Sequence, residues 1–394
     1  MMNLAERLSR IEEPQTIKMA KLSRALKAEG KDIIDLSLGE PDFKTPDYIV
    51  DAAIQAMKEG YTKYPPVAGY PELRKVITEK LQRDNLLDYS PEEVMVCTGA
   101  KQCIANAVLS IINPGDEVII PTPYWVTYGD IVKLAEGTVV EVKSSLEHDF
   151  KITPEQLEAA ITPKTRLFIF SSPCNPTGSI YTREELQGLV HVFDKHPSIF
   201  IISDEIYEYI NFVGSHESIA QFPEVKDHVV VINGLSKGYA MTGWRLGYMA
   251  GNKELISSCE KIQSQFTSGP NSITQRAAIT AISGGRASSD AMQKDFKARR
   301  DFVVSSLKLI PGVKVNNPPG AFYVFPDISS FFGKHGIQNA MDMCMYLLSD
   351  AMVSTVTGEA FGDPNCIRIS YATSMENLQI AMDRMKVSLA KLNS

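Results

Sequence analysis

Residues 229–247 read VVVINGLSKGYAMTGWRLG, and they decide how the rest of the chain is interpreted. A run of β-branched residues leads into Gly-Leu-Ser-Lys-Gly, which predicts a buried strand that ends in a tight turn. The turn presents Lys237. An amine beside apolar surface loses solvation, which lowers its pKa and makes it nucleophilic toward carbonyl groups. Arg245 can supply a fixed positive charge for a phosphate or carboxylate. The stretch therefore predicts covalent carbonyl chemistry on an anionic ligand.

Further apolar runs of strand length occur on both sides of this stretch. They are VMVCTG (94–99), EVIIPTP (117–123), GTVVEV (137–142), TRLFIFSSP (165–173), IFIISDE (199–205) and RLGYMAG (245–251). Helical patterns lie between them, including residues 101–112 and 182–196, where Thr182 and Glu185 form a predicted capping box. Alternating strands and helices predict an α/β fold with a mostly parallel sheet. Ligand chemistry is expected at the carboxyl ends of its strands.

The pattern changes near residue 290, where a long charged helix (290–310) begins. Mixed strands follow (312–316, 321–327 and 366–372), and then a final helix over 375–392. The first forty-odd residues are helical and then extended, and we expect them to pack with this part. The sequence thus predicts a large domain of residues 46–289 and a smaller α+β domain of residues 1–45 with 290–394.

Composition excludes several classes of function. The 394 residues carry a net charge of −7, which argues against general nucleic-acid binding. No apolar run is long enough for a membrane span, and the N-terminus lacks a signal-peptide core, so we expect a cytoplasmic protein. The six cysteines include no Cys-x-x-Cys pair, and the six histidines form no metal-binding spacing. We therefore expect no metal.

Three strand ends bear side chains whose chemistry fits together. Asn175 follows one strand, Asp204 ends the next with Tyr207 one helical turn on, and Lys237 follows a third. If these strands are neighbours, an amide, an acid, a phenol and an amine meet at one edge of the sheet. Pyridoxal phosphate needs this set: a lysine for its aldehyde, a carboxylate for its ring nitrogen, and donors for its ring oxygen.

A phosphate site is also predicted. Gly99, Ala100 and Lys101 lie where a strand turns into a helix, so free backbone N–H groups face an anion. Ser236 and Arg245 can add a hydroxyl and a guanidinium, and Trp125 offers a flat face for a ring. Each residue alone has a simpler explanation, such as a surface lysine, a helix cap, a turn or a core aromatic. The ordered set at successive strand ends makes those explanations improbable.

The sequence resembles the class I aminotransferases of the fold-type I pyridoxal-phosphate superfamily, and most of all the bacterial aspartate aminotransferases. The likeness covers nearly the whole chain, and SSPCNPTG in combination with the SK…GWR segment is its most specific part. Its motifs are DLSLGEPDFKTPD (35–47), TKYPPVAGYPELR (62–74), TGAKQ (98–102), PYWVTY (123–128), SSPCNPTG (171–178), SDEIYEYI (203–210), LSKGYAMTGWRLGY (235–248) and RISYATSMENL (368–378).

The resemblance implies a role for each matching residue. Lys237 would bind the cofactor covalently and move the substrate proton. Asp204 would pair with the ring nitrogen, while Tyr207 and Asn175 would contact the ring hydroxyl. Trp125 would stack on the ring, and Arg368 with the backbone of Gly39 would hold the substrate α-carboxylate. The phosphate would be held by Gly99, Ala100, Lys101, Ser236 and Arg245, and by Tyr64 from the other subunit of a homodimer.

The resemblance also implies ping-pong transamination between an amino acid and a 2-oxo acid. Relatives that act on acidic substrates recognise the distal carboxylate with a Ser-Thr pair and a lysine. This chain has Gln15, Thr16 and Lys101 at those positions. We expect L-aspartate and 2-oxoglutarate as the main pair, with aromatic amino acids as secondary substrates and prephenate amination as an alternative.

Two rival functions are compatible with parts of the sequence. Residues 234–238 satisfy Gly-x-Ser-x-Gly, the serine-hydrolase pattern, and only His335 lies downstream of Ser236 as a base. Alternatively, the chain could be a cofactor-binding regulator without catalysis. The negative net charge, the lack of an added DNA-binding domain and the intact lysine–arginine set argue against a regulator. Other reactions of the same scaffold stay open, since fold does not fix function.

Overall fold

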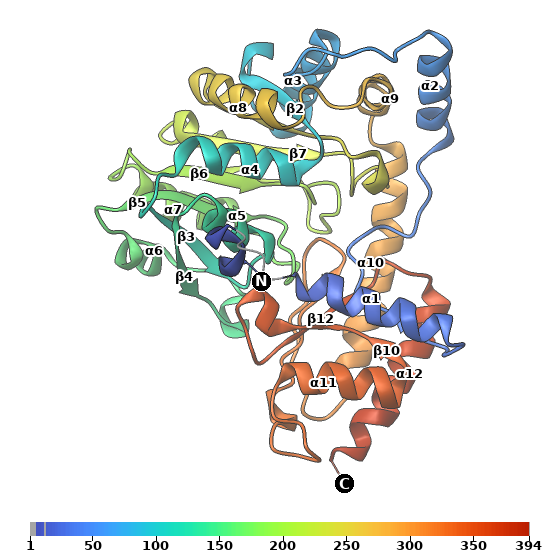
Figure 1. The fold of residues 1–394 in the computed structure, drawn as a ribbon. Coiled ribbons are helices and arrows are strands. Elements are labelled where there is room, and N and C mark those ends of the chain that lie inside the picture. Colours follow the sequence, from blue (N-terminus) through green and yellow to red (C-terminus); the bar gives the residue numbers. More distant parts are fainter. Residues whose placement is uncertain (1–4, 12, 394) are drawn as a thin grey trace.

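A seven-stranded sheet forms the centre of the larger part of the molecule (Figure 1). The computed structural model describes residues 5–11 and 13–393. The strands are ordered β2 (Val94–Cys97), β8 (Gly247–Ala250), β7 (Val229–Gly234), β6 (Phe200–Asp204), β5 (Thr165–Ser171), β3 (Glu117–Thr122) and β4 (Thr138–Lys143). β8 runs antiparallel to both of its neighbours, and the other adjacent pairs are parallel. This confirms the predicted α/β class and its mostly parallel sheet.

Helices cover both faces of the sheet, which explains why its central strands are largely apolar on both faces, unlike the partly exposed edge strand β4. Val229 and Val231 of β7 pack into one hydrophobic cluster, while Val230 and Ile232 pack into another on the opposite face. One face is covered by α4 (Ala100–Ile111), α5 (Thr127–Leu134) and α8 (Lys253–Phe266). The other is covered by α2 (Asp47–Lys58), α3 (Pro71–Asn85), α6 (Pro154–Ala160), α7 (Arg183–Phe193) and α9 (Ser272–Ser283). The predicted Thr182–Glu185 capping box begins α7.

A separate hydrophobic cluster joins the N-terminal segment to the C-terminal third of the chain. It is built by α1 (Gln15–Ala28), α10 (Ala287–Lys308), α11 (Ala340–Tyr346) and α12 (Met375–Lys391). Short sheets complete it: β1 (Ile34–Asp35) pairs with β10 (Val353–Ser354), and β12 (Ile367–Ser370) lies between β11 (Val356–Thr357) and β9 (Tyr323–Val324). In Figure 1, α1 lies across this part on the side that faces the large sheet.

One small strand that was predicted from the sequence is not formed. Residues 312–316 form only an isolated bridge between Lys314 and Asp327. Gly312 has a positive φ of 94°, and Pro318 and Pro319 follow shortly after the segment, so the backbone cannot continue a ladder there. The helices predicted over 290–310 and 375–392 are present as α10 and α12. The domain boundary at residues 45/46 and 289/290 stays a prediction, and α10 runs through its second position.

Within the described ranges, no helix combines the length and the apolar character needed to cross a membrane.

Candidate active site

A cavity of about 460 Å³ lies at the carboxyl ends of β5, β6 and β7. It brings together all of the predicted site residues except Gly99, Tyr64 and Gln15. Those that line it are Gly39, Ala100, Lys101, Trp125, Asn175, Asp204, Tyr207, Ser236, Lys237, Arg245 and Arg368. The cavity is closed on the far side by α1, whose Thr16, Ile17, Ala20 and Arg24 contribute to the wall.

Strand order explains why the chemistry meets at this edge. β5, β6 and β7 are adjacent and parallel, and the register places Asp204 beside Ser171 of β5 and Ile232 of β7. The turns that leave β5 and β7 then carry Asn175 and Lys237 to the same side. The expectation that these three strands are neighbours is therefore confirmed.

The surroundings of Lys237 make its amine more nucleophilic by lowering its pKa. Burial lowers its pKa to about 8, and the positive charges of Arg368 and Arg245 act in the same direction, although the carboxylate of Glu40 opposes them. Its Nζ donates a hydrogen bond of 2.5 Å to the carbonyl oxygen of Gly39. At neutral pH a larger fraction of molecules therefore holds this amine uncharged than would for an ordinary lysine.

Asp204 is a buried carboxylate, with 3% of the residue exposed. Its Oδ2 accepts a hydrogen bond of 2.7 Å from the hydroxyl of Tyr128, and its Oδ1 accepts one of 3.2 Å from the backbone N–H of Ile206. Burial outweighs these donors and raises the pKa of Asp204 to about 6. At neutral pH the group is therefore mostly an anion that lacks solvation, which favours a cationic ring nitrogen as its ligand.

Arg368 is buried without a full set of partners. Nη1 donates to Oδ1 of Asn175 at 3.1 Å, and Nη2 donates to the carbonyl of Ser37 at 2.6 Å. Nε has no hydrogen-bond partner in the part of the chain that the structure describes. The guanidinium also lies 4.6 Å from the ring centre of Tyr323. A buried guanidinium with an unused donor, open to a cavity, fits a carboxylate ligand.

An anion cradle lies where β2 passes into α4. Gly99 has a φ of +84°, and a Cβ there would come within 2.5 Å of Nη2 of Arg245. A Cβ on Gly247 would come within 2.3 Å of the backbone nitrogen of Ala100. Both glycines are therefore needed so that the guanidinium and the first N–H groups of α4 can converge. This arrangement suits a phosphate group.

Lys101 and Trp125 form a contact on the wall beside the cradle. Nζ of Lys101 lies 4.9 Å from the ring centre of Trp125, which is within the range of a cation–π interaction. Burial lowers the pKa of Lys101, and the neighbouring Arg245 lowers it further. The pair thus adds both a flat ring and a positive charge to the cavity.

Two aromatic residues of the site were missed in the sequence. Tyr128 lies within the quoted motif PYWVTY, three residues after Trp125, and holds Asp204. Tyr323 shares a hydrogen bond of 2.8 Å with Tyr207 through the two hydroxyls. The helical spacing from Trp125 could have pointed to Tyr128, whereas Tyr323 comes from a distant part of the chain and carried no local signal.

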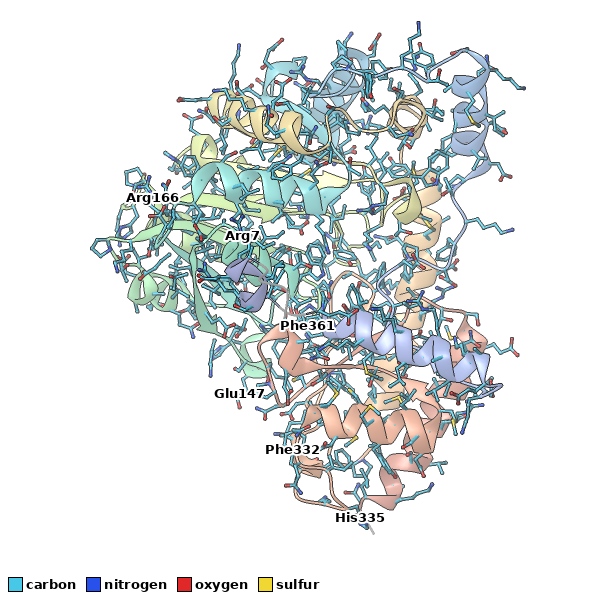
Figure 2. All side chains as sticks on the ribbon, in the orientation of Figure 1. Arg7, Glu147, Arg166, Phe332, His335 and Phe361 are labelled. Atoms are coloured by element: carbon cyan, nitrogen blue, oxygen red, sulfur yellow. The ribbon has the colours of Figure 1, made fainter. Side chains whose placement is uncertain are left out.

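Three other residues lie outside the cavity. Tyr64 is 96% exposed, so its predicted contact with a second subunit stays a prediction. Thr16 lines the wall, whereas Gln15 is not among the lining residues, so the Gln15 amide is not presented to the cavity. His335 is exposed on a loop of the C-terminal part, which Figure 2 places at the end of the molecule distant from the sheet. Ser236 therefore has no histidine base from the serine-hydrolase pattern.

Comparison with known proteins finds relatives over nearly the full length of the chain. Residues 31–385 match the family described as "Aminotransferase class I and II". An aspartate/prephenate aminotransferase from Cereibacter sphaeroides is 48% identical over 397 residues, covering 99% of each chain. An aspartate aminotransferase from Geobacillus stearothermophilus is 46% identical over 386 residues, covering 98% of each.

The fold comparison gives the same result. The crystal structure of the aspartate aminotransferase from Rhizobium meliloti superposes with a TM-score of 0.96 at 42% identity, covering 100% of both chains. Sequence, architecture and the residues of the cavity lead to one conclusion: the chain belongs to the class I and II aminotransferase family.

Proposed function

We propose that the protein is a pyridoxal-phosphate-dependent aspartate aminotransferase that moves an amino group from L-aspartate to 2-oxoglutarate. The observation that carries this proposal is one cavity in which the Lys237 amine, the buried Asp204 carboxylate and the incompletely paired Arg368 guanidinium meet. The names of the relatives from Cereibacter sphaeroides and Geobacillus stearothermophilus support the choice of aspartate.

The residues present fit pyridoxal phosphate. The glycine-dependent cradle of Gly99, Ala100 and Arg245 would hold its phosphate, and Asp204 would hold its ring nitrogen. Asn175 and Tyr207 would contact the ring oxygen, with Trp125 against the ring face. When bound, the cofactor supplies an aldehyde for the amino group and an electron sink for the bond that breaks at the α-carbon.

Three side chains that line the cavity would bind the substrate, move its proton and keep the cofactor ring protonated. The Arg368 guanidinium, which lines the cavity, would hold the α-carboxylate and so fix the α-carbon near Lys237. The amine of Lys237, whose pKa is lowered to about 8, would take the α-proton and return it on the cofactor side. Asp204 would keep the ring nitrogen protonated, because an anion without solvation is stabilised by a cation beside it.

Substrate choice would depend on two sides of the cavity. Lys101, at the start of α4, offers a positive charge to a second carboxylate, and Thr16 of α1 offers a hydroxyl. Prephenate is a second candidate substrate, since the Cereibacter sphaeroides relative at 48% identity is named for both aspartate and prephenate. Aromatic amino acids would be secondary substrates in the same cavity.

We further propose a homodimer with composite sites. Tyr64 is the residue that the resemblance assigns to the other subunit's phosphate, and its 96% exposure leaves it accessible to a second chain. Sedimentation of the cofactor-loaded protein tests this. A monomer at micromolar concentration would contradict it.

The function is tested by cofactor attachment followed by assay. Protein loaded with pyridoxal phosphate and reduced with borohydride should carry the cofactor on the peptide that contains Lys237. With 2-oxoglutarate as acceptor, L-aspartate should react faster than L-alanine or L-phenylalanine. An aspartate rate no greater than these two would contradict aspartate specificity, and a label on no lysine would contradict the cofactor assignment.

A further inference from the structure

The segment that carries Asp204 also holds two carboxylates that point away from the cavity. Asp204, Glu205 and Glu208 are 3%, 1% and 5% exposed, so three acidic residues within five positions are nearly inaccessible to water. Glu205 continues the strand, because its N–H donates to the carbonyl of Ile232 on β7 at 2.8 Å. Successive side chains of a strand point to opposite faces, so Asp204 faces the cavity and Glu205 faces its back.

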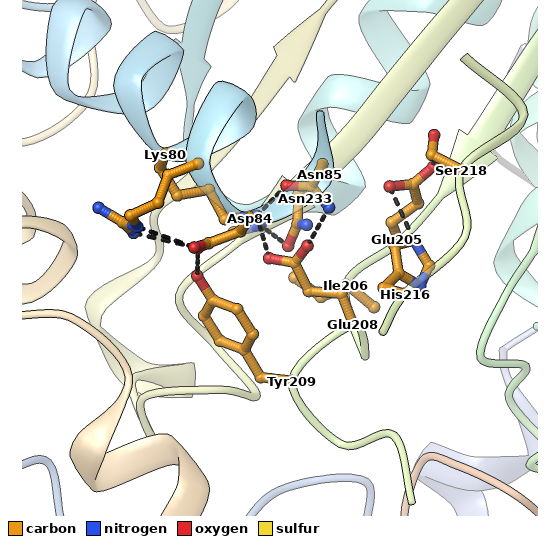
Figure 3. Close-up of polar contacts among 12 residues, drawn as sticks. Lys80, Asp84, Asn85, Glu205, Ile206, Glu208, Tyr209, His216, Ser218 and Asn233 are labelled. Carbon is orange, nitrogen blue, oxygen red and sulfur yellow. Dashed lines mark hydrogen bonds and ion pairs between the residues drawn. The ribbon is translucent and has the colours of Figure 1, made fainter. Parts of the chain in front are cut away.

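Glu205 is held by three groups behind the site (Figure 3). Oε1 accepts hydrogen bonds from the hydroxyls of Ser203 at 2.9 Å and Ser218 at 2.6 Å. Oε2 lies 2.9 Å from Nε2 of His216 as an ion pair. His216 and Ser218 come from one loop that returns to the sheet behind Asp204. The carboxylate of Glu205 is therefore fixed in direction, with one imidazole beside it.

His216 is suited to act as a cation beside Glu205. The imidazole is buried, and burial alone would lower its pKa, but the Glu205 carboxylate outweighs this, so the pKa of His216 is raised. Glu208 acts in the same direction as Glu205, while Lys80 opposes them. Neither Nδ1 nor Nε2 has a hydrogen-bond partner among the described residues, so the contact with Glu205 is the 2.9 Å ion pair alone. An isolated buried carboxylate is costly, and a charged imidazole offsets that cost.

The charge of Glu205 reaches the cofactor side of the segment. Burial raises the pKa of the Asp204 carboxyl, and the negative charge of Glu205 raises that pKa further. If Glu205 had no cation, Asp204 would be driven toward its neutral form and could not pair with a cationic ring nitrogen. We propose that Glu205 and His216 are positioning residues: Glu205 anchors the Asp204 segment through Ser203 and Ser218, and His216 offsets the Glu205 charge so that Asp204 stays ionised for the cofactor. This proposal rests on the proposed function.

A second buried pair provides a matched control. Lys80 of α3 forms an ion pair with Glu208, and both side chains are almost fully buried. Asn85 bridges them, accepting from Lys80 at 2.7 Å and donating to Glu208 at 2.8 Å. Figure 3 shows this group apart from Glu205 and His216. Removing the cation of this pair imposes a comparable structural cost without leaving a charge on the residue next to Asp204.

The test measures cofactor affinity in apoprotein by the quenching of tryptophan fluorescence, since Trp125 lines the cavity. His216→Asn should weaken pyridoxal phosphate binding about tenfold, the equivalent of one pKa unit. Glu205→Gln/His216→Asn should regain most of that loss, because no unpaired charge remains. Lys80→Gln should lower the melting temperature but keep the affinity within about threefold of wild type. A double variant that binds pyridoxal phosphate no more tightly than His216→Asn would overturn the proposal. If the two residues had only structural roles, the losses of affinity would add and not compensate.

A measurement on the unmodified apoprotein covers the case in which His216→Asn does not fold. With ¹⁵N-labelled histidine, the His216 signal, assigned through Glu205→Gln, should be mostly doubly protonated at pH 6.5, where an ordinary histidine is about half neutral. A neutral His216 at that pH would overturn the proposal. Wild-type protein that does not bind pyridoxal phosphate would instead contradict the proposed function, and leaves the histidine measurement unaffected.

Discussion

The two walls of the cavity are built in different ways. On the sheet side, Asp204 and Lys237 follow adjacent parallel strands, and backbone register alone brings them together. On the opposite side, Arg368 reaches Ser37 across 331 positions of sequence, and Thr16 comes from α1. Under the proposed function, the sheet wall would hold the groups for the chemistry, and the opposite wall would hold groups that select a carboxylate substrate. Changes on the two walls should therefore have different signatures.

The largest effect is expected on the sheet wall. Lys237→Ala removes the only side chain we assign to proton transfer, so turnover of aspartate should fall by about 10⁴-fold. The assay is oxaloacetate formation from aspartate and 2-oxoglutarate. Lys226→Ala, which alters an exposed lysine bonded to the carbonyl of Asp88, is the control and should stay near wild type. A Lys237→Ala rate close to that of the control would show that the chemistry lies elsewhere.

A change on the opposite wall should weaken the use of substrate and leave cofactor attachment intact. Arg368→Lys keeps the charge but loses the planar fork, so kcat/KM for aspartate should fall by about 100-fold. Borohydride should still attach the cofactor to Lys237 in this variant. If attachment of the cofactor to Lys237 were lost together with kcat/KM, the assignment of chemistry to one wall and substrate selection to the other would be wrong.

A smaller effect is expected at Tyr128, which lines the sheet wall beside Asp204. Tyr128→Phe deletes the 2.7 Å donor to Asp204, and removing a hydrogen bond to a charged group should weaken cofactor binding about tenfold. The donor stabilises the ionised form, so its loss raises the Asp204 pKa above its value of about 6. The defect should therefore grow as pH falls from 8 to 6. Fluorescence titration at both pH values measures it, and an equal defect at both would exclude this explanation.

The smallest effect is expected at α1. Thr16→Val removes a hydroxyl from the wall but conserves shape, so kcat/KM for aspartate should fall about fivefold, as for one ordinary hydrogen bond. The rate with phenylalanine, which lacks the second carboxylate, should change little. The measurement is the rate of Thr16→Val with each of the two substrates. An equal fall in the aspartate and phenylalanine rates would show that Thr16 does not select the substrate.

The difference between the walls also explains what the sequence could predict. All of the large-sheet strands were expected from their apolar runs, and the residues at their ends converge as predicted. The antiparallel direction of β8 was not expected, because a short apolar strand has no marker of direction. Tyr323 was missed since its hydrogen bond to Tyr207 joins residues 116 positions apart. Local patterns determine the sheet wall, whereas the opposite wall depends on packing between distant segments.

The central claim is that Lys237, Asp204 and Arg368 together transfer an amino group from aspartate. The most direct measurement is a half-reaction with cofactor-loaded protein and L-aspartate, without any 2-oxo acid. The account predicts rapid release of about one oxaloacetate per chain, then no more until 2-oxoglutarate is added, since the amino group stays on the enzyme. Continuous release of product without an acceptor, or no oxaloacetate at all, would contradict it.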